Sequence, residues 1–375
     1  MNFMTYQYTC LILLTFLVGC SNHADPDKEI PISLDKFADG IHHYELFAEE
    51  LDYPRLDTSN YRGIADNLVT FQNEDGGWPK NIDWLADVDM DSLKNTLSPR
   101  DVQSTFDNDN THPQIDFLAR MYSRTGNEKY RESAEEGLRY ILETQNPSGG
   151  WRGWDVDAIT FNDNVMTGIM EVLLDVKTGK SYYEWVEPEL RRELNQAFDE
   201  ALDVTLRCQI EVNGVKKAWG QQHDHQTLEP VQGRTYEFPA VVSRESVGVV
   251  EFLMQINNPD ERIVEAVDAA VSWMRRSGLE NIRIDTIHIS PDTYPGQNLD
   301  VDRKVTIDSS ASTIWARYYE VEGNTPFFAT RSGEKVYSLA EVNPERRGGY
   351  AWYGYWPAEL IEEKYPAWKK REGLK

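Results

Sequence analysis

The sequence predicts a mostly α-helical chain whose consecutive helix pairs form an (α/α) barrel or incomplete toroid, with a short C-terminal cap that contains β-strands. Three observations support this prediction. A loop motif ending in tryptophan recurs along the chain, apolar residues recur at helical spacing between the loops, and one helix of each pair is apolar on nearly all sides. A repeat of this kind places the starts of the inner helices on one face.

The recurring loop is rich in glycine. It reads QNEDGGW at 72–78 and QNPSGGW at 145–151, and a degenerate copy, QIEVNGVKKAW, occupies 209–219. After each copy a carboxylate opens an apolar helix: Asp107, Asp163 and Glu245. We therefore expect the loops to gather carboxylates at one end of the helical repeat.

Helical periodicity predicts the helices between these loops. Apolar residues recur at helical spacing over 115–122, 130–142, 165–174, 190–206 and 247–256. Gly126, between the first two, is suited to a left-handed helix end. The first helix of each pair is the more apolar and is expected to be buried, whereas the second is amphipathic and faces water on one side.

The C-terminal part follows a different pattern. Residues 282–289 alternate apolar and polar side chains, and residues 301–308 do so in part, which predicts short strands. Residues 345–357 crowd aromatic side chains beside glycines and arginines. We expect this segment to form a cap over the helices.

The first 20 residues resemble a bacterial lipoprotein signal. The apolar run from Leu11 to Val18 is too short to span a bilayer and is followed by Gly19 and Cys20, the expected lipidation site. An ordinary secretory signal is the alternative. Residues 21–36 are expected to be a tether and residues 37–375 a single catalytic domain. This predicts a monomer in the outer membrane or periplasm that meets the membrane only through its lipid.

The composition restricts the function further. The 375 residues carry a formal net charge of −25 and are 40% hydrophobic. Such a chain can bury a large core, but it lacks the basic surface needed to bind nucleic acid without regard to sequence. Any anionic substrate would need local cations. Only Cys208 lies outside the N-terminal segment, so no internal disulfide is expected there.

Seven motifs point to one family. In order along the chain they are GGWPKN at 76–81, TFDN at 105–108, ITFNDN at 159–164, AWGQQHD at 218–224, GRTYEFPA at 233–240, ESVG at 245–248 and WARYYE at 315–320. Together they resemble the family 10 pectate lyases across residues 60–357. The resemblance implies an (α/α) toroid, a calcium cofactor and β-elimination on galacturonan.

The chemistry of β-elimination explains the residue types. Removing the C5 proton of a uronic acid adds charge to a group that is already anionic, so nearby cations stabilise the intermediate. Asp107 and Asp163 are the expected metal ligands, since calcium takes oxygen ligands and the resemblance gives the matching positions metal and substrate roles. Helix capping is their alternative role. Glu245 is interpreted as a third site carboxylate or as a structural partner of Arg244.

Several side chains in the sequence are candidates for the proton-transfer group. The resemblance implies Arg234 as the base, although an arginine side chain is ordinarily always protonated. His223 and Tyr236 are the ordinary candidates for proton transfer, with a structural histidine as the alternative for His223. The expected substrate-binding residues are Lys80, Arg317, Asn108, His112 and Trp151. The two cations suit a carboxylate, and the tryptophan would stack on a sugar unless it packs helix ends.

One stretch departs from the family. After the first Asp-Asn the chain reads DNDNTHP, where the family usually has small residues, which adds Asp109 and His112. We predict a carbon–oxygen lyase that breaks the C4–O bond of a uronic-acid glycan and leaves a 4,5-unsaturated uronate. The alternatives are a dehydratase that expels water from the non-reducing terminal uronate of ulvan oligosaccharides, a glycoside hydrolase with two carboxylates, and a non-catalytic glycan-binding lipoprotein.

Overall fold

The computed structural model describes residues 33–47, 53–290, 293 and 300–374. The predicted signal segment, its Cys20 and residues 21–32 of the predicted tether lie outside the described residues. Within the described part of the chain, no helix combines the length and the apolar character needed to cross a bilayer.

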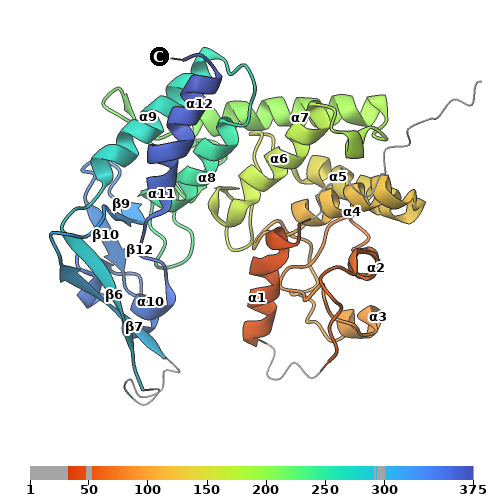
Figure 1. Cartoon of the computed structure of the whole chain (residues 1–375), viewed down its shortest axis with the longest axis horizontal. Coiled ribbons are helices and arrows are strands. Elements are labelled where there is room, and N and C mark those ends of the chain that lie inside the picture. Colours follow the sequence, from red (N-terminus) through yellow and green to blue (C-terminus); the bar gives the residue numbers. More distant parts are fainter. Residues whose placement is uncertain (1–32, 48–52, 291–292, 294–299, 375) are drawn as a thin grey trace, which may run out of the picture.

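Helices make up most of the ordered elements (Figure 1). Their bounds are α1 (Ala38–Phe47), α2 (Tyr61–Phe71), α3 (Met90–Lys94), α4 (His112–Thr125), α5 (Glu128–Thr144), α6 (Val165–Lys177), α7 (Pro188–Arg207), α8 (Ser243–Leu253), α9 (Glu261–Ser277), α10 (Pro344–Gly349), α11 (Trp356–Glu359) and α12 (Tyr365–Arg371). The predicted mainly helical fold is confirmed, and the five segments predicted from periodicity coincide with α4 to α8.

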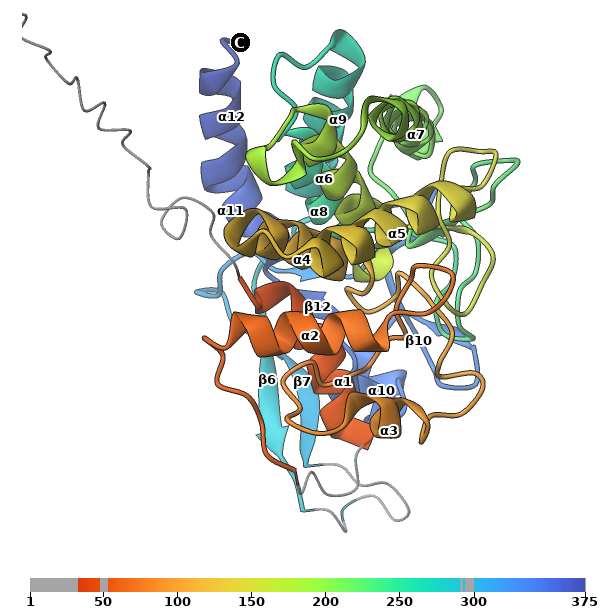
Figure 2. The ribbon, with the colours of Figure 1, turned by 90° about the vertical axis from the view of Figure 1, so that its right-hand side faces the viewer.

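The long helices pack as consecutive antiparallel pairs (Figure 2). α4 packs on α5, α6 on α7 and α8 on α9. The first members, α4, α6 and α8, contact one another in turn, and the second members, α5, α7 and α9, do the same. The pairs therefore form two rows, and the starts of the helices in the first row lie close together.

The two rows differ in composition as the sequence predicts. α6 is buried along nearly its whole length, whereas α7 buries only one apolar stripe. Gly126 ends α4 in the left-handed conformation with a φ of 65°, where a side chain would be strained. The inner row is therefore the core of the helical part, and the outer row shields it from solvent.

The recurring glutamine fastens each loop to a helix of the next pair. The Gln145 side-chain amide donates to the Gly149 carbonyl at 2.9 Å and to the Ala197 carbonyl of α7 at 3.0 Å. Gly149 has a φ of 98°, and a Cβ there would lie 2.6 Å from a carbonyl of α7. The equivalent bonds join Gln72 to Gly76 and Ser133, and Gln209 to Lys217 and Ala266.

The tryptophan of each motif closes the other side of the same loop. The indole N–H of Trp151 donates to the Ile141 carbonyl of α5 at 2.8 Å. Trp78 and Trp219 form the same type of bond with Leu68 and Thr205. All three tryptophans are completely buried. Trp151 is therefore a structural residue, and the prediction that it stacks on a sugar is wrong.

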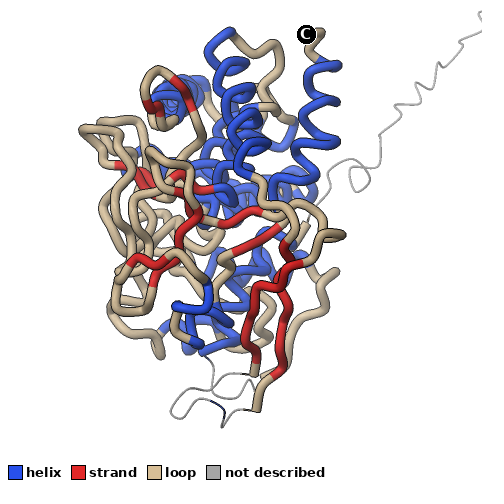
Figure 3. The backbone as a smooth tube through the Cα atoms, turned by 90° about the vertical axis from the view of Figure 1, so that its left-hand side faces the viewer, coloured by secondary structure: helices blue, strands red, loops and turns tan. Residues whose placement is uncertain are grey.

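The C-terminal cap contains most of the strands (Figure 3). The strands are β1 (Ile159–Thr160), β2 (Glu211–Val212), β3 (Val215–Lys216), β4 (Gln222–His223), β5 (Val241–Val242), β6 (Ile282–His288), β7 (Val301–Ile307), β8 (Trp315–Ala316), β9 (Tyr318–Tyr319), β10 (Pro326–Ala329), β11 (Lys335–Val336) and β12 (Tyr353–Gly354). β6 and β7 form the antiparallel pair predicted for 282–289 and 301–308. A four-stranded sheet has the order β11-β10-β9-β5.

The cap has a small apolar core of its own, which includes Phe327, Phe328, Tyr350 and Trp352. Beyond it, α11 and α12 return to the helices and pack beside α8 and α9, as Figure 1 shows. No repeat or motif in the sequence predicts this return, although Trp368 of α12 is buried in the main core.

Replacing Gln145 with alanine should lower the free energy of unfolding by about 1–3 kcal/mol, because two carbonyls lose their donor in a part-buried loop. The measurement is urea-induced unfolding followed by circular dichroism. Gln196→Ala is the matched control, since Gln196 is exposed on α7 and should change stability by less than about 0.5 kcal/mol. Equal stability of the two variants would refute the tethering role of Gln145.

Candidate functional site

A cavity of about 1100 Å³ lies where the helix-start loops meet the cap. The loops contribute Asp107 and Asp163, α1 contributes Asp39 and His43, and the cap contributes Tyr350. Figure 1 shows α1 and the cap on either side of the starts of the inner helices. The cavity therefore has a floor made from the repeat and two walls made from opposite ends of the described chain.

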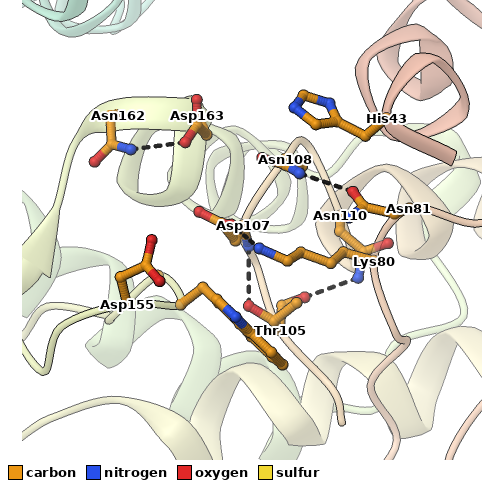
Figure 4. A network of polar contacts seen from close by, with 12 residues as sticks. His43, Lys80, Asn81, Thr105, Asp107, Asn108, Asn110, Asp155, Asn162 and Asp163 are labelled. Carbon is orange, nitrogen blue, oxygen red and sulfur yellow. Dashed lines mark hydrogen bonds and ion pairs between the residues drawn. The ribbon is translucent and has the colours of Figure 1, made fainter. Parts of the chain in front are cut away.

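The loop before α4 holds Asp107 in place through its backbone. The Asp107 N–H donates to the Thr105 hydroxyl at 3.1 Å. The Asn110 amide donates to the carbonyls of Trp78 and Thr105 at 2.6 and 2.9 Å, so this loop is bound to the first tryptophan motif. Figure 4 shows Asp107, Asn108 and Asp163 around one space. The predicted convergence of the two aspartates is thus found.

Both carboxylate loops contain residues in a strained backbone region. Asn108, Asp109 and Thr111 have φ values of 57°, 47° and 65°, and Asp163 and Asn164 have φ values of 50° and 53°. L-residues seldom adopt positive φ, and each such residue costs of the order of 1–3 kcal/mol. Because backbone strain is concentrated in both loops, we infer that these side chains are held in place for function as well as for folding.

The two aspartates differ in their surroundings. The Asp107 carboxylate forms an ion pair with the Lys80 ammonium, and the Lys80 nitrogen also lies 4.6 Å from the centre of the Trp154 ring. Asp163 accepts a hydrogen bond from the Asn162 amide at 2.7 Å. Burial, together with the charge of Asp107, raises the pKa of Asp163 to about 7, and Arg317 opposes this shift. The site therefore favours a cation beside Asp163.

The rest of the cavity is rich in cations. Of its lining residues seven are basic and five are acidic, although the whole chain carries a net charge of −25. The basic residues are Lys80, Arg100, Arg234, Arg244, Arg317, Arg331 and Arg346. This local reversal of charge is the feature that an anionic ligand requires in an acidic protein.

Arg317 is buried at the cavity wall and is paired with Glu245. Its Nε donates to Glu245 Oε1 at 3.0 Å, and its guanidinium carbon lies 4.6 Å from the centre of the Tyr350 ring. Burial alone would raise the pKa of Glu245, but the charge and hydrogen bond of Arg317, together with the charge of Arg244 and the hydrogen bond from Gln221, lower that pKa. Glu245 is therefore the ion-pair partner of Arg317. The interpretation from the sequence that it pairs with Arg244 is wrong.

Arg234 lies at the cavity wall and is paired with Glu237. One of its terminal nitrogens lies 2.6 Å from Glu237 Oε1, and the Arg234 backbone N–H donates to the same carboxylate at 3.0 Å. Burial would lower the pKa of Arg234, but pairing with Glu237 outweighs it and raises the pKa above the ordinary arginine value. The guanidinium is thus held as a cation, which suits binding of an anion.

Tyr236 lines the cavity beneath several arginines. Its ring lies 5.1 Å from the guanidinium carbons of both Arg234 and Arg346 and 5.7 Å from that of Arg331. Burial is the main cause that raises the pKa of the Tyr236 hydroxyl. Tyr236 is therefore a neutral phenol at physiological pH, able to donate a hydrogen bond in the cavity.

Two predicted histidines lie elsewhere. His223 is fully buried, with Nδ1 bonded to the Leu228 carbonyl at 2.8 Å and Nε2 accepting from the Gly220 N–H at 2.9 Å. Both nitrogens are engaged, and burial lowers the pKa of His223 to about 4. His112 is buried under α6 and lines a neighbouring pocket with Asp109. The predicted role of His223 in proton transfer is therefore wrong, and His112, a predicted substrate-binding residue, lies outside this cavity.

Other cavity residues escaped the sequence analysis. His43 and Asp39 lie on α1, whose sequence carries no recognised motif. Arg244 was considered only as a partner of Glu245, yet its side chain is exposed to the cavity and forms no ion pair with the described residues. Trp154 lies in the loop that follows the second tryptophan motif. A search for cations and aromatic residues next to the motifs would have found Arg244 and Trp154, but not His43.

The carboxylates fit the calcium that the sequence resemblance implies. Asp107 and Asp163 face each other, and burial together with the charge of Asp107 raises the pKa of Asp163. Such a pair suits a hard cation that takes oxygen ligands. No group of three or more acidic, histidine or cysteine side chains suited to a metal occurs within the described residues. Asp107 and Asp163 would thus hold the ion with a neutral oxygen, such as that of Asn108, and with substrate.

Comparison with known proteins agrees with this geometry. The family model described as pectic acid lyase matches residues 72–361. The family 10 polysaccharide lyase from Cellvibrio cellulosa is 26% identical, with a TM-score of 0.68 over 84% of this chain and 93% of that chain. An aspartate-to-alanine variant of that enzyme in complex with trigalacturonic acid gives the same identity and TM-score over 84% and 94%. No curated protein matches the chain.

Asp163→Asn should stabilise the protein at alkaline pH. The folded-state pKa of about 7 exceeds the ordinary aspartate value of about 3.9, so ionisation disfavours folding increasingly as the pH rises between these values. Solvent access through the cavity reduces the effect to about 1–2 kcal/mol above pH 7. Asparagine also tolerates the positive φ.

The test is urea unfolding of both proteins near pH 4 and pH 8 in the presence of a chelator. The variant should gain stability only at pH 8, and the exposed control Glu193→Gln should show no comparable gain. A variant that is less stable than the original protein at pH 8 would show that the charged form of Asp163 is favoured in the fold.

Proposed function

Because the chain belongs to the pectic acid lyase family and is a polysaccharide lyase, we propose that it breaks the C4–O bond of a uronic-acid glycan by β-elimination. The product would be a 4,5-unsaturated uronate at the new non-reducing end. The observation that best supports this proposal is the cavity, in which seven basic side chains surround two convergent aspartates, although the whole chain has a net charge of −25. The complex of the Cellvibrio enzyme with trigalacturonic acid supports an anionic oligosaccharide as the substrate.

The cavity supplies what this reaction needs. Arg244 and Lys80 provide positive charge for the sugar carboxylate, and Arg317 adds to it from the wall. Cations at this position stabilise the anion formed when the C5 proton leaves. Asp107 and Asp163 would hold calcium, which supplies further positive charge at the carboxylate when bound. Asn108 has its amide bonded to Asn81 at 2.8 Å, which leaves its carbonyl oxygen for the metal or the sugar.

The second candidate is elimination of water from a terminal uronate, as in the predicted ulvan-oligosaccharide dehydratase. Helix α1 favours it, because α1 precedes the matched segment 72–361 and places Asp39 and His43 on one wall of the cavity. A wall at this place would admit a chain end more readily than the middle of a polymer. The hydrolase and the non-catalytic binding protein have no support once the chain belongs to a lyase family.

We further propose that the two rows of helices form the incomplete (α/α) toroid expected from the sequence, and that a monomer is anchored in the bacterial cell envelope through a lipid on Cys20. The successive contacts within each row support the first proposal. The Leu17-Val18-Gly19-Cys20 sequence supports the second.

Incubation with polygalacturonate, ulvan, alginate or ulvan oligosaccharides should produce the ultraviolet absorbance of an unsaturated uronate with at least one of them. Asp163→Ala should reduce the rate to background and leave the far-ultraviolet circular dichroism unchanged, whereas Glu193→Ala, on the outer surface of α7, should retain full activity.

Mass spectrometry of the products distinguishes the two candidate reactions. Shortened unsaturated chains indicate a lyase, and an intact chain lighter by one water indicates a dehydratase. Reducing ends without unsaturation would disprove elimination.

Removal of metal should abolish activity reversibly. We expect a chelator to reduce the rate to background and added calcium to restore it, because two aspartates then face each other without a bound cation. Direct calcium binding by isothermal titration calorimetry should weaken strongly in Asp163→Ala. Full activity in the chelator would show that the basic side chains suffice without metal.

A further inference from the structure

One hydrogen bond joins the two carboxylate loops to each other. The Asn164 side-chain amide donates to Asp109 Oδ1 at 2.9 Å. It is the only hydrogen bond between residues 105–111 and residues 159–164, both of which the structure describes completely. The glutamines of the loop motifs fasten each loop to a helix, whereas this bond fastens one loop to the other. Its loss would therefore change how the two loops lie relative to each other.

The two bonded residues lie next to the aspartates of the main cavity but not in that cavity. Asp109 follows Asp107 by two positions, and Asn164 directly follows Asp163. Both bonded side chains line two neighbouring pockets, and neither lines the main cavity. They are therefore placed to act on the site through the adjacent carboxylates and not by touching the sugar.

The bond connects two residues with a left-handed backbone. The φ values are 47° for Asp109 and 53° for Asn164. Such conformations persist only where the surrounding structure imposes them, and a side-chain bond between the two residues supplies part of that constraint. Aspartate and asparagine also adopt this conformation more readily than most L-residues. The pair thus links the loops at a low cost in backbone strain.

The packing of His112 brings the two loops close enough for this bond. His112, the first residue of α4, is buried against Gly168 of α6, where a Cβ would lie 2.2 Å from the His112 ring. Only glycine leaves room for the ring, so the start of α4 lies directly on α6. His112 Nε2 is 3.9 Å from Asp109 Oδ1, and neither ring nitrogen has a hydrogen-bond partner among the described residues. The Asp109 carboxylate thus has the His112 ring and the Asn164 amide as neighbours.

We propose that Asp109 is a positioning residue, which acts through Asn164 to fix the Asp163 carboxylate relative to that of Asp107. This inference rests on the proposed function, in which those two carboxylates hold calcium. It gives a role to a residue by which the stretch DNDNTHP departs from the family, since a small side chain at position 109 could not accept the bond from Asn164. Groups that orient metal ligands without touching the metal typically change its affinity by about 10–100-fold.

The first test asks whether the bond couples the loops in the absence of metal. Asp109→Gly and Asn164→Gly each remove one partner and leave a residue that tolerates positive φ. Urea unfolding in a chelator should show that the second substitution costs less stability in the presence of the first, because the shared bond is already lost. Strictly additive effects of the two substitutions would overturn the proposal.

The second test measures calcium binding by isothermal titration calorimetry. Both glycine variants should bind calcium about 10–100-fold more weakly than the original protein, because the ligand loops lose their connection. Asp109→Asn should bind nearly as tightly as the original protein, since its side-chain oxygen still accepts from Asn164. If Asp109→Asn weakened binding as much as Asp109→Gly, the charge of Asp109 would be acting on the ion directly, and the positioning role would be wrong.

The matched control is Asn213→Gly. Asn213 also has a left-handed backbone, with a φ of 52°, but lies in the exposed turn between β2 and β3. This variant should keep the calcium affinity of the original protein. An equal loss of affinity in the control would mean that the effect of glycine is general, and it would contradict a specific role for the bond between Asp109 and Asn164.

These results remain distinct from failure of the proposed function. If the original protein binds calcium and forms unsaturated product, but both glycine variants bind calcium equally well, only this inference fails. If calcium binding responds as expected and no glycan yields unsaturated product, the elimination is wrong and the positioning role stands. If elimination occurs without calcium binding, the metal assignment fails and kcat becomes the readout. It should then fall in both glycine variants, and an unchanged kcat would overturn the inference.

Discussion

The site depends on the paired hydrogen bonds that the glutamine of each loop motif makes to backbone carbonyls. One carbonyl belongs to the loop itself and the other to the second helix of the following pair, so the loop cannot move without disturbing the next pair. The buried tryptophan fastens the same loop to the helix before it. Because each loop leads to the start of an inner helix, these bonds set where Asp107 and Asp163 lie relative to each other.

The electrostatics of the cavity follow from this arrangement. Two aspartates are brought together at the floor, where burial and the charge of Asp107 disfavour the charge of Asp163, and the cap places arginines against them. The pair Arg317–Glu245 shows how the protein stabilises such a charge: the carboxylate is buried, its arginine is buried with it, and the ring of Tyr350 covers the guanidinium. A lone buried charge would cost several kcal/mol, so these cations and anions are interdependent.

The sequence predicted those parts of the fold that repeat. Periodicity located α4 to α8, alternation located β6 and β7, and the shared motif implied that Asp107 and Asp163 would meet. It could not distinguish a tryptophan that binds sugar from one that closes a loop, because burial depends on the neighbouring helix and not on the motif. His223 and His112 were misjudged for the same reason. His43 was missed because nothing in its own segment repeats, and its place in the cavity depends on the contacts of Phe37 with Phe117 and of Lys36 with Glu171, far along the chain.

The left-handed residues in the two carboxylate loops have a consequence for how this protein can change over time. Asparagine, aspartate and glycine bear this backbone conformation at the least cost, so the Asp163 carboxylate can be exchanged for an amide or for hydrogen without disturbing the chain path. Keeping the fold therefore does not require keeping this acid. A descendant could lose it, keep the basic walls and the helical frame, and persist as a receptor that holds charged sugars without altering them.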